Sequence, residues 1–225
     1  ILFPLILILG IIISLSTSQG FYEKEISKPE VISRDYVTEE EGKLITKNTL
    51  EYLKGKTEIN STIVGEKAAI HMVDVKNLIN LSKYLLITLI IFFLICLLIL
   101  KKNKQRDLIP KILVNGSIIT ILFNILLFIL SKVSFTKFWR VFHQIMFTND
   151  AWQLNPYKEP LVAVFSQRFF LDFINFVIYS SIIMAVIFII IGISWQYTFS
   201  QSKNIEKKSE GNKKIKAKKS EDFQW

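Results

Sequence analysis

Long apolar runs alternate with polar segments along the chain, and this alternation predicts membrane-spanning helices. A helix needs about 20 mainly apolar residues to cross the hydrocarbon layer of a bilayer. Four segments approach or meet that length: residues 1–20, 81–100, 108–130 and 169–197. We therefore predict four transmembrane helices.

The first apolar run has a second interpretation. It is short, and the small residues Ser16, Ser18 and Gly20 at its end are typical of a signal-peptide cleavage site. A cleaved signal peptide is therefore the alternative to a first span. The chain does not begin with Met, which leaves open whether residues precede Ile1.

The polar segments predict two outer regions, one short turn and a tail. Residues 101–107 are a short turn, whereas 131–168 form a longer outer loop. Residues 21–80 are too many for a bare connection and predict a small extracellular cap. The expected fold class is therefore an all-α polytopic membrane protein with four transmembrane helices and this cap. Residues 198–225 form a basic tail.

Inside the cap, one helix has a clear start signal. Thr38 and Glu41 match a capping box, in which each side chain bonds the other residue's backbone N–H. This pair predicts a helix that continues to about Gly55. The β-branched pair Val31 and Ile32 suggests a short strand in the same cap.

The distribution of charge predicts the orientation of the spans. The net charge is +9, and the Lys and Arg residues concentrate in 101–111 and 203–219. By the positive-inside rule, both segments face the cytoplasm. The cap and the 131–168 loop then lie outside, with both termini inside. We expect the tail to be solvated and disordered and to contact anionic membrane lipid. No nucleic-acid-binding fold accompanies it, so a nucleic-acid partner is not expected.

Polar and small residues inside the spans predict how the helices pack. Asn115 and Asn124 lie in the third apolar run, where we expect them to face the bundle and to hydrogen-bond there. Gly116 would let another helix approach closely. Cys96 is the only cysteine, so it cannot form an intramolecular disulfide.

The chain has two histidines, and each lies in a polar cluster at the outer end of a span. His71 follows Glu66 and lies three residues before Asp74, which puts both on one face of a helix. His143 lies among aromatic residues, near Arg140, and is followed by Asn149, Asp150 and Trp152. Ionisable groups at membrane depth are costly, which favours a functional role. We predict that the spans bring the two histidines together.

The residues alone leave three functional classes open. His71, His143 and either Asp74 or Asp150 could bind a metal in a membrane hydrolase, but no local pair has metal-ligand spacing. A serine hydrolase lacks its Gly-x-Ser-x-Gly turn. The aromatic residues could also form an interfacial belt in a non-enzymatic scaffold or transport accessory protein.

Two sequence strings resemble a known family. The strings are EKAAIHMVDVK at 66–76, and FHQIMFTNDAW at 142–152 with Asn155-Pro156 after it. In this order, and with four spans, they resemble the lipoprotein intramolecular transacylases (Lit) of bacterial membranes. The sequence departs from the family where an acid is expected at Asn155 and Pro-Glu at Ser166-Gln167.

The resemblance implies an acyltransferase at the outer face of the bacterial plasma membrane. Its partner would be a diacylglyceryl lipoprotein, and no cofactor or metal is expected. The acyl chain at the glyceryl sn-2 position would move to the α-amine of the N-terminal cysteine. A histidine can act as both acid and base near neutral pH.

The resemblance and the acid/base chemistry together suggest individual roles. We expect His71 to be the base, oriented by Asp74, and His143 to donate to the oxyanion or to the leaving oxygen. A covalent acyl-imidazole on either ring is the alternative route. The residues expected to bind or orient the substrate are Glu66, Asp74, Arg140, Asn149, Asp150 and Trp152.

Overall fold

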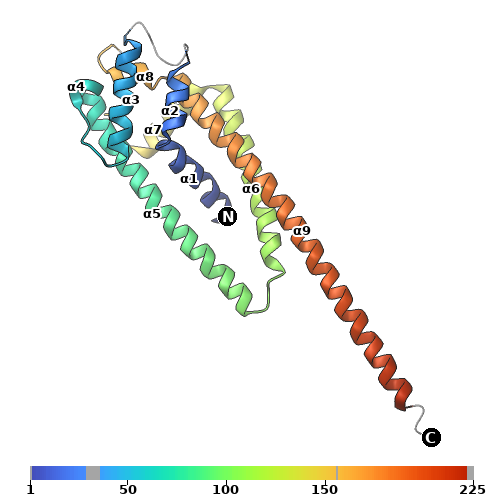
Figure 1. The fold of residues 1–225 in the computed structure, drawn as a ribbon. Coiled ribbons are helices and arrows are strands. Elements are labelled where there is room, and N and C mark those ends of the chain that lie inside the picture. The colour runs from blue at the N-terminus through green and yellow to red at the C-terminus, as the bar shows by residue number, and fades with distance from the viewer. Residues whose placement is uncertain (1, 29–35, 156, 222–225) are drawn as a thin grey trace.

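The computed structural model describes residues 2–28, 36–155 and 157–221, and all regular structure within these ranges is helical (Figure 1). The expected all-α class is confirmed. The strand expected at Val31 and Ile32 lies outside the described residues. The helices are α1 (Leu2–Ser16), α2 (Gln19–Ile26), α3 (Glu39–Leu53), α4 (Ser61–Val64), α5 (Glu66–Lys102), α6 (Leu108–Val133), α7 (Phe135–Met146), α8 (Pro160–Val164) and α9 (Gln167–Glu221).

Three helices are long and apolar enough to cross a membrane. They are α5, α6 and the Gln167–Ser202 part of α9. The fourth candidate is a broken span, in which α1 and α2 meet at a bend of 65°. With 15 residues, α1 is about 22 Å long, less than the roughly 30 Å hydrocarbon core. The chain is thus a multi-pass membrane protein with three continuous spans and one broken candidate span.

The helices α6 and α9 form the most extensive helix pair, and a buried polar contact joins them. The Ser181 hydroxyl donates to Asn124 Oδ1 at 2.9 Å, and the Asn124 amide donates to the Thr120 carbonyl at 2.8 Å. The prediction for Asn124 is therefore confirmed. The prediction for Asn115 is wrong, because that side chain is exposed. At about 100° per residue, two positions nine residues apart lie on opposite faces of a helix.

Helix α1 packs between α5 and the α6–α9 pair, and Gly116 allows its close approach. A Cβ atom at Gly116 would lie 2.9 Å from the Phe3 ring, so the predicted close approach is confirmed. The Phe3 ring packs edge-on against Phe188 at 5.0 Å between centroids. Helix α1 leads into α2 at the cap, so it occupies the same half of the bundle as the cap (Figure 1).

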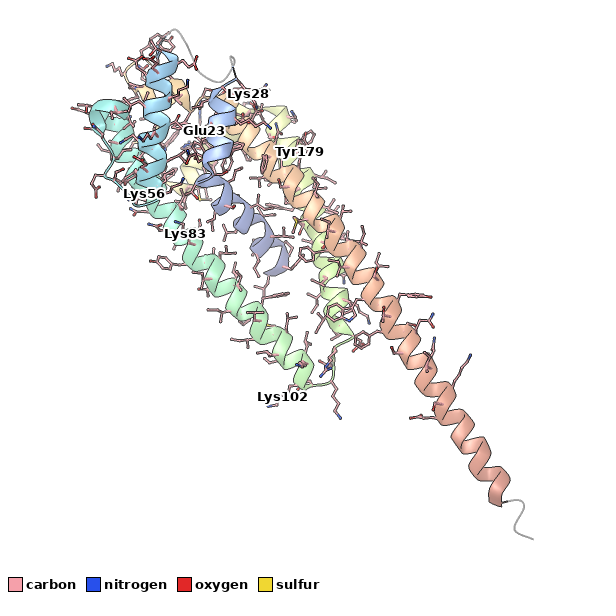
Figure 2. The ribbon with its side chains drawn as sticks, in the orientation of Figure 1. Glu23, Lys28, Lys56, Lys83, Lys102 and Tyr179 are labelled. Carbon is pink, nitrogen blue, oxygen red and sulfur yellow. The ribbon has the colours of Figure 1, made fainter. Side chains whose placement is uncertain are left out.

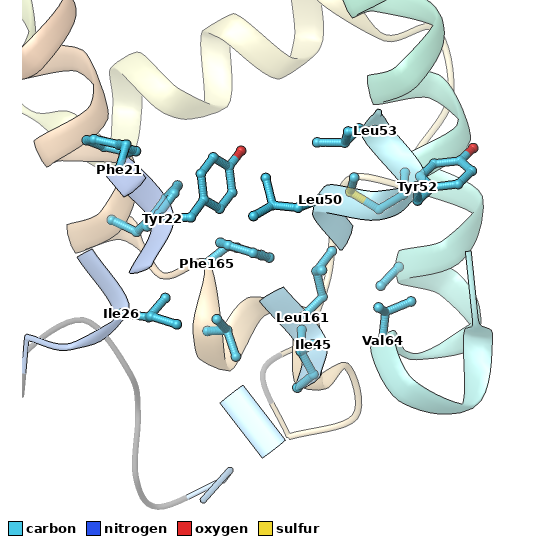
Figure 3. Close-up of a cluster of buried hydrophobic side chains, with 14 of the residues drawn as sticks. Phe21, Tyr22, Ile26, Ile45, Leu50, Tyr52, Leu53, Val64, Leu161 and Phe165 are labelled. Carbon is cyan, nitrogen blue, oxygen red and sulfur yellow. The ribbon is translucent and has the colours of Figure 1, made fainter. Parts of the chain in front are cut away.

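The cap packs on a hydrophobic core that continues into α1, α5 and α9 (Figure 3). The capping box of α3 is present: Thr38 N–H donates to Glu41 Oε2 at 2.7 Å, and Glu41 N–H donates to Thr38 Oγ1 at 3.3 Å. Helix α3 ends before Gly55, whose φ is 74°, as predicted. The core side chains include Phe21, Tyr22, Ile26, Ile45, Leu50, Tyr52, Leu53, Val64, Leu161 and Phe165.

A cluster of charges ties α2 to α9 at the cap end of the bundle (Figure 2). The Lys28 ammonium lies 2.6 Å from the buried carboxylate of Glu25 and 3.0 Å from that of Asp172. Arg168, one turn before Asp172, is 3.3 Å from the same carboxylate. The cluster holds the second half of the broken candidate span against the start of α9.

Helices extend into the predicted outer loop and into the basic tail. The loop at 131–168 contains α7 and α8, and the predicted cap segment ends with the first turns of α5, which carry His71 and Asp74. Helix α9 continues through the basic tail to Glu221, so the expectation of a disordered tail is wrong up to that residue. Lys, Glu, Gln and Ala favour helices, and extending an existing helix avoids the cost of nucleation.

Candidate active site

The structure brings the two histidines together at the cap end of the spans. His71 lies in the second turn of α5 and His143 lies in the last turn of α7. Their ring centroids are 5.7 Å apart, and the side chains are 8% and 6% exposed. The apolar run of α5 begins near residue 81, about 15 Å further along the helix. Both rings therefore lie beyond the apolar part of α5, on the side of the cap.

The protonation of His143 is set by its own helix. Its Nδ1 lies 2.7 Å from the carbonyl oxygen of Trp139, one turn earlier in α7. A carbonyl only accepts, so Nδ1 carries the proton and Nε2 of the neutral ring holds a free lone pair. Burial lowers the pKa of His143, and the bond to Trp139 opposes that effect. His143 is therefore neutral near pH 7, with Nε2 available as a base.

His71 has a different environment. Its Nδ1 is buried, with no hydrogen-bond partner among the described residues. Burial and, to a smaller extent, the charge of a protonated His143 lower the pKa of His71 to about 4, although Asp74 partly opposes both effects. A neutral ring with so low a pKa is a weak base. It can still donate a hydrogen bond from whichever nitrogen carries its proton.

Aromatic rings surround the histidine pair. Phe147 packs edge-on against His71 at 4.9 Å between centroids and lies 5.6 Å from His143. Trp139 and Trp152 lie 4.6 Å and 5.2 Å from the His143 ring. Such rings leave few groups for water to bond, and a low-dielectric surrounding strengthens electrostatic interactions. Trp152 therefore lies beside the histidine pair.

Three hydrogen bonds fasten α5 to the segment that follows α7. Asn149 donates to Asp74 Oδ2 at 3.0 Å, and Lys67 donates to the Gln153 carbonyl at 2.7 Å. The third, from the Ala68 backbone N–H to Glu159 Oε2, is 3.2 Å long and buried. These three bonds lie on both sides of His71 along α5, so they set its position relative to the segment that carries His143.

Glu159 is a site residue that the sequence did not reveal. Gly65 precedes α5 with φ of 102°, a conformation that residues with L side chains rarely adopt. Because glycine has no side chain, it cannot cap the helix itself. Glu159 Oε2 would lie only 1.8 Å from a Cβ atom at Gly65. The carboxylate therefore uses the space that glycine leaves and caps α5 from another part of the chain. A glycine directly before the His71 helix was the only signal in the sequence.

The other residues predicted to bind or orient the substrate are more exposed to solvent than the histidine pair. Glu66, Arg140, Asn149 and Asp150 are exposed, and Asp150 accepts a bond of 2.7 Å from the Gln153 amide. The Asp74 carboxylate accepts a bond from Asn149, and its charge acts on His71, whose Nδ1 has no hydrogen-bond partner among the described residues. Among the described residues, no three His, Cys, Asp or Glu side chains are grouped as metal ligands.

These features define a class: a polytopic helical membrane protein with a buried histidine pair, enclosed by aromatic rings beneath a small cap. The family model of the lipoprotein intramolecular transacylase Lit matches residues 1–170. The chain therefore belongs to the Lit family of membrane acyltransferases. No curated protein sequence matches the chain.

Solved structures of Lit from Bacillus cereus have the same fold. One, determined in meso, has a TM-score of 0.71 and 23% identity, and the match covers 91% of this chain and 93% of that chain. A variant with a histidine replaced by arginine has a TM-score of 0.67, 22% identity and coverages of 91% and 90%. In a variant with the histidine replaced by alanine these values are 0.69, 22%, 91% and 91%. At this identity the likeness shows the fold.

Proposed function

We propose that this protein moves an acyl chain within one diacylglyceryl lipoprotein, from the glyceryl sn-2 oxygen to the α-amine of the N-terminal cysteine. The product is an N-acylated lyso-form of the same lipoprotein. Membership of the Lit family supports this reaction. The observation that carries the chemistry is the pair of buried histidine rings 5.7 Å apart.

Donor and acceptor belong to the same molecule, so the protein's main task is to position them. Well-oriented intramolecular reactions gain up to about 7–11 kcal/mol from positioning alone. The reaction rearranges one substrate and consumes no water. A dry aromatic surrounding therefore suits it, because water in the site would hydrolyse the ester instead. Phe147 and Trp152, which contact the histidines, are the residues we expect to exclude water.

The tautomer of His143 favours it as the base, the reverse of the assignment made from sequence. Its Nε2 takes a proton from the neutral α-amine as that nitrogen attacks the ester carbonyl carbon, and a C–N bond forms. The tetrahedral intermediate then collapses, the C–O bond to the glyceryl oxygen breaks, and that oxygen takes the proton from His143. General acid–base catalysis of this kind contributes about 10²–10⁴-fold.

His71 suits the other role. Because its pKa is about 4, the ring stays neutral at pH 7 and would donate N–H to the oxyanion of the intermediate. A neutral donor does not compete with the base for a proton. We expect Arg140, Asp150 and Glu66, which are exposed around the site, to hold the glyceryl or peptide end of the substrate.

We place this reaction at the outer face of the bacterial plasma membrane. The Lys and Arg residues of the α5–α6 turn and of the tail favour the cytoplasm, at the other end of the spans from the histidines. A single cysteine introduced at exposed Gln144, with Cys96 replaced by serine, should react with a membrane-impermeant maleimide in intact cells. Labelling only after lysis would reverse the orientation.

The reaction is tested by mass spectrometry of a lipoprotein's N-terminal peptide after incubation with the purified protein in vesicles. The informative variant is His143→Asn, because the asparagine amide can still donate to the Trp139 carbonyl while the Nε2 lone pair is lost. We expect acyl transfer to fall at least about 100-fold. Gln144→Ala, an exposed neighbour on α7, is the matched control and should keep wild-type activity.

Several outcomes would contradict the proposal. Full activity of His143→Asn or of His71→Asn would remove that residue from the chemistry. An acylated histidine trapped at low temperature would replace direct transfer by the acyl-imidazole route. Loss of activity with a chelator, restored by a stoichiometric metal, would favour the metal-dependent hydrolase class instead.

A further inference from the structure

A hollow of about 280 Å³ lies at the far end of the bundle from the histidines. It forms where the turn between α5 and α6 lies against α9, near the position of Lys102 in Figure 2. Its lining consists of Lys101, Lys104, Arg106, Asp107 and Phe199. The proposed acyl transfer uses none of these residues.

The backbone of Lys104 is unusual. With φ of 58°, it is the only residue other than glycine with a positive φ among the described residues. It occupies the position after the C-cap of α5 in a Schellman motif: Gln105 N–H donates to the Leu100 carbonyl at 2.9 Å, and Lys104 N–H donates to the Lys101 carbonyl at 3.3 Å. Glycine is the usual residue there, because an L side chain is disfavoured. A strained residue of this kind calls for a functional explanation.

The hollow also has uncompensated positive charge. Three of its five lining residues are cationic and one is acidic. The ion pairs found among the described residues all lie elsewhere and involve Lys28, Lys43 and Arg168. Helix α6 begins beside the hollow, and its N-cap Asp107 makes no side-chain capping bond. The dipole of α6 adds partial positive charge at that helix end.

We propose that this hollow binds the phosphate of an anionic phospholipid headgroup, in the leaflet opposite the histidines. Lys101, Lys104 and Arg106 would contact the phosphate, and Phe199 would pack against the glycerol. The volume lies just below the roughly 300–1,000 Å³ of small-molecule sites, which suits a headgroup whose acyl chains remain outside. Basic sites between spans on the cytoplasmic side are a known mode of headgroup binding. The proposal is independent of the acyl-transfer reaction.

The decisive variant is Lys104→Gly, because it removes one cation and replaces a disfavoured residue by the one that the turn prefers. A loss of binding could therefore not be attributed to misfolding. The matched control is Lys102→Ala, which removes the same charge from the last turn of α5 but does not line the hollow. The full chain in detergent is titrated with phosphatidylglycerol or phosphatidylcholine, and bound lipid is counted by native mass spectrometry.

We expect wild type and Lys102→Ala to retain one phosphatidylglycerol in preference to phosphatidylcholine. Lys104→Gly should bind phosphatidylglycerol about five-fold more weakly, the effect of about one basic residue near a lipid surface. Its melting temperature and acyl transfer should not fall below those of wild type. Equal loss in both variants would mean only a diffuse charge effect, and unchanged binding in Lys104→Gly would exclude its role. Competition by millimolar inorganic phosphate would instead identify a free-anion site; each of these results overturns the proposal.

Discussion

The buried bond between Glu159 and the start of α5 gives the sharpest test of how the site is held. Replacing Glu159 by alanine leaves the Ala68 N–H buried without an acceptor, which costs about 1–3 kcal/mol. Losing a carboxylate at a helix N-terminus costs about a further 0.3–1 kcal/mol. We therefore expect Glu159→Ala to lower the free energy of unfolding by about 1–4 kcal/mol.

The effect on activity follows from the position of His71, one turn after Ala68 in α5. A displacement of about 1 Å in a catalytic group can cost about 100-fold in rate. Glu159→Ala should therefore lower kcat by about 10- to 100-fold with little change in KM, because Glu159 positions His71 and does not touch substrate. The rate is measured as N-acylated peptide formed per minute, and stability as unfolding in a denaturing detergent.

Two variants separate the bond from the charge. Glu159→Gln keeps an oxygen acceptor for Ala68 and should retain most of the activity. Gly65→Ala puts a Cβ where Glu159 Oε2 lies and should reproduce the defect of Glu159→Ala although the glutamate is intact. Glu58→Ala, an exposed acid of the cap, is the control. Wild-type rate and stability in Glu159→Ala would refute the reasoning, as would a Gln variant as defective as the Ala variant.

Three further predictions concern the histidines, the aromatic shell and the α6–α9 contact. Because burial lowers the pKa of His143 and takes that of His71 from 6.5 to about 4, the unfolded state binds more protons between these values. The melting temperature should therefore fall as the pH drops from about 6.5 toward 4, and a melting temperature that stays constant there would contradict these shifts. The value of kcat/KM should fall only once the pH drops below the lowered pKa of His143, because its Nε2 is then protonated. Trp152→Ala should admit water and raise the ratio of hydrolysed to transferred acyl chain, measured as free fatty acid. Ser181→Ala leaves Asn124 without its donor and should cost about 0.6–1.7 kcal/mol of unfolding free energy, measured in denaturing detergent.

Local patterns in the sequence determined much of this protein. Runs of apolar residues identified the spans because their signal depends only on composition and length. Thr38 and Glu41 identified the start of α3 because both partners of a capping box lie within one turn. The aromatic and polar strings around His71 and His143 pointed to the candidate site, and their order along the chain indicated the family.

Contacts between distant segments were decided only by the tertiary structure. Glu159 lies 91 positions from its partner Ala68, and Asn149 lies 75 positions from Asp74, so no periodicity links them. The sequence therefore assigned Asp74 to His71 and gave Glu159 no role. We propose His143 and not His71 as the base for a geometric reason: Nε2 of His143 keeps its lone pair because Nδ1 bonds a backbone carbonyl. Local preferences select helices and their ends, whereas partners across the site depend on how those helices pack.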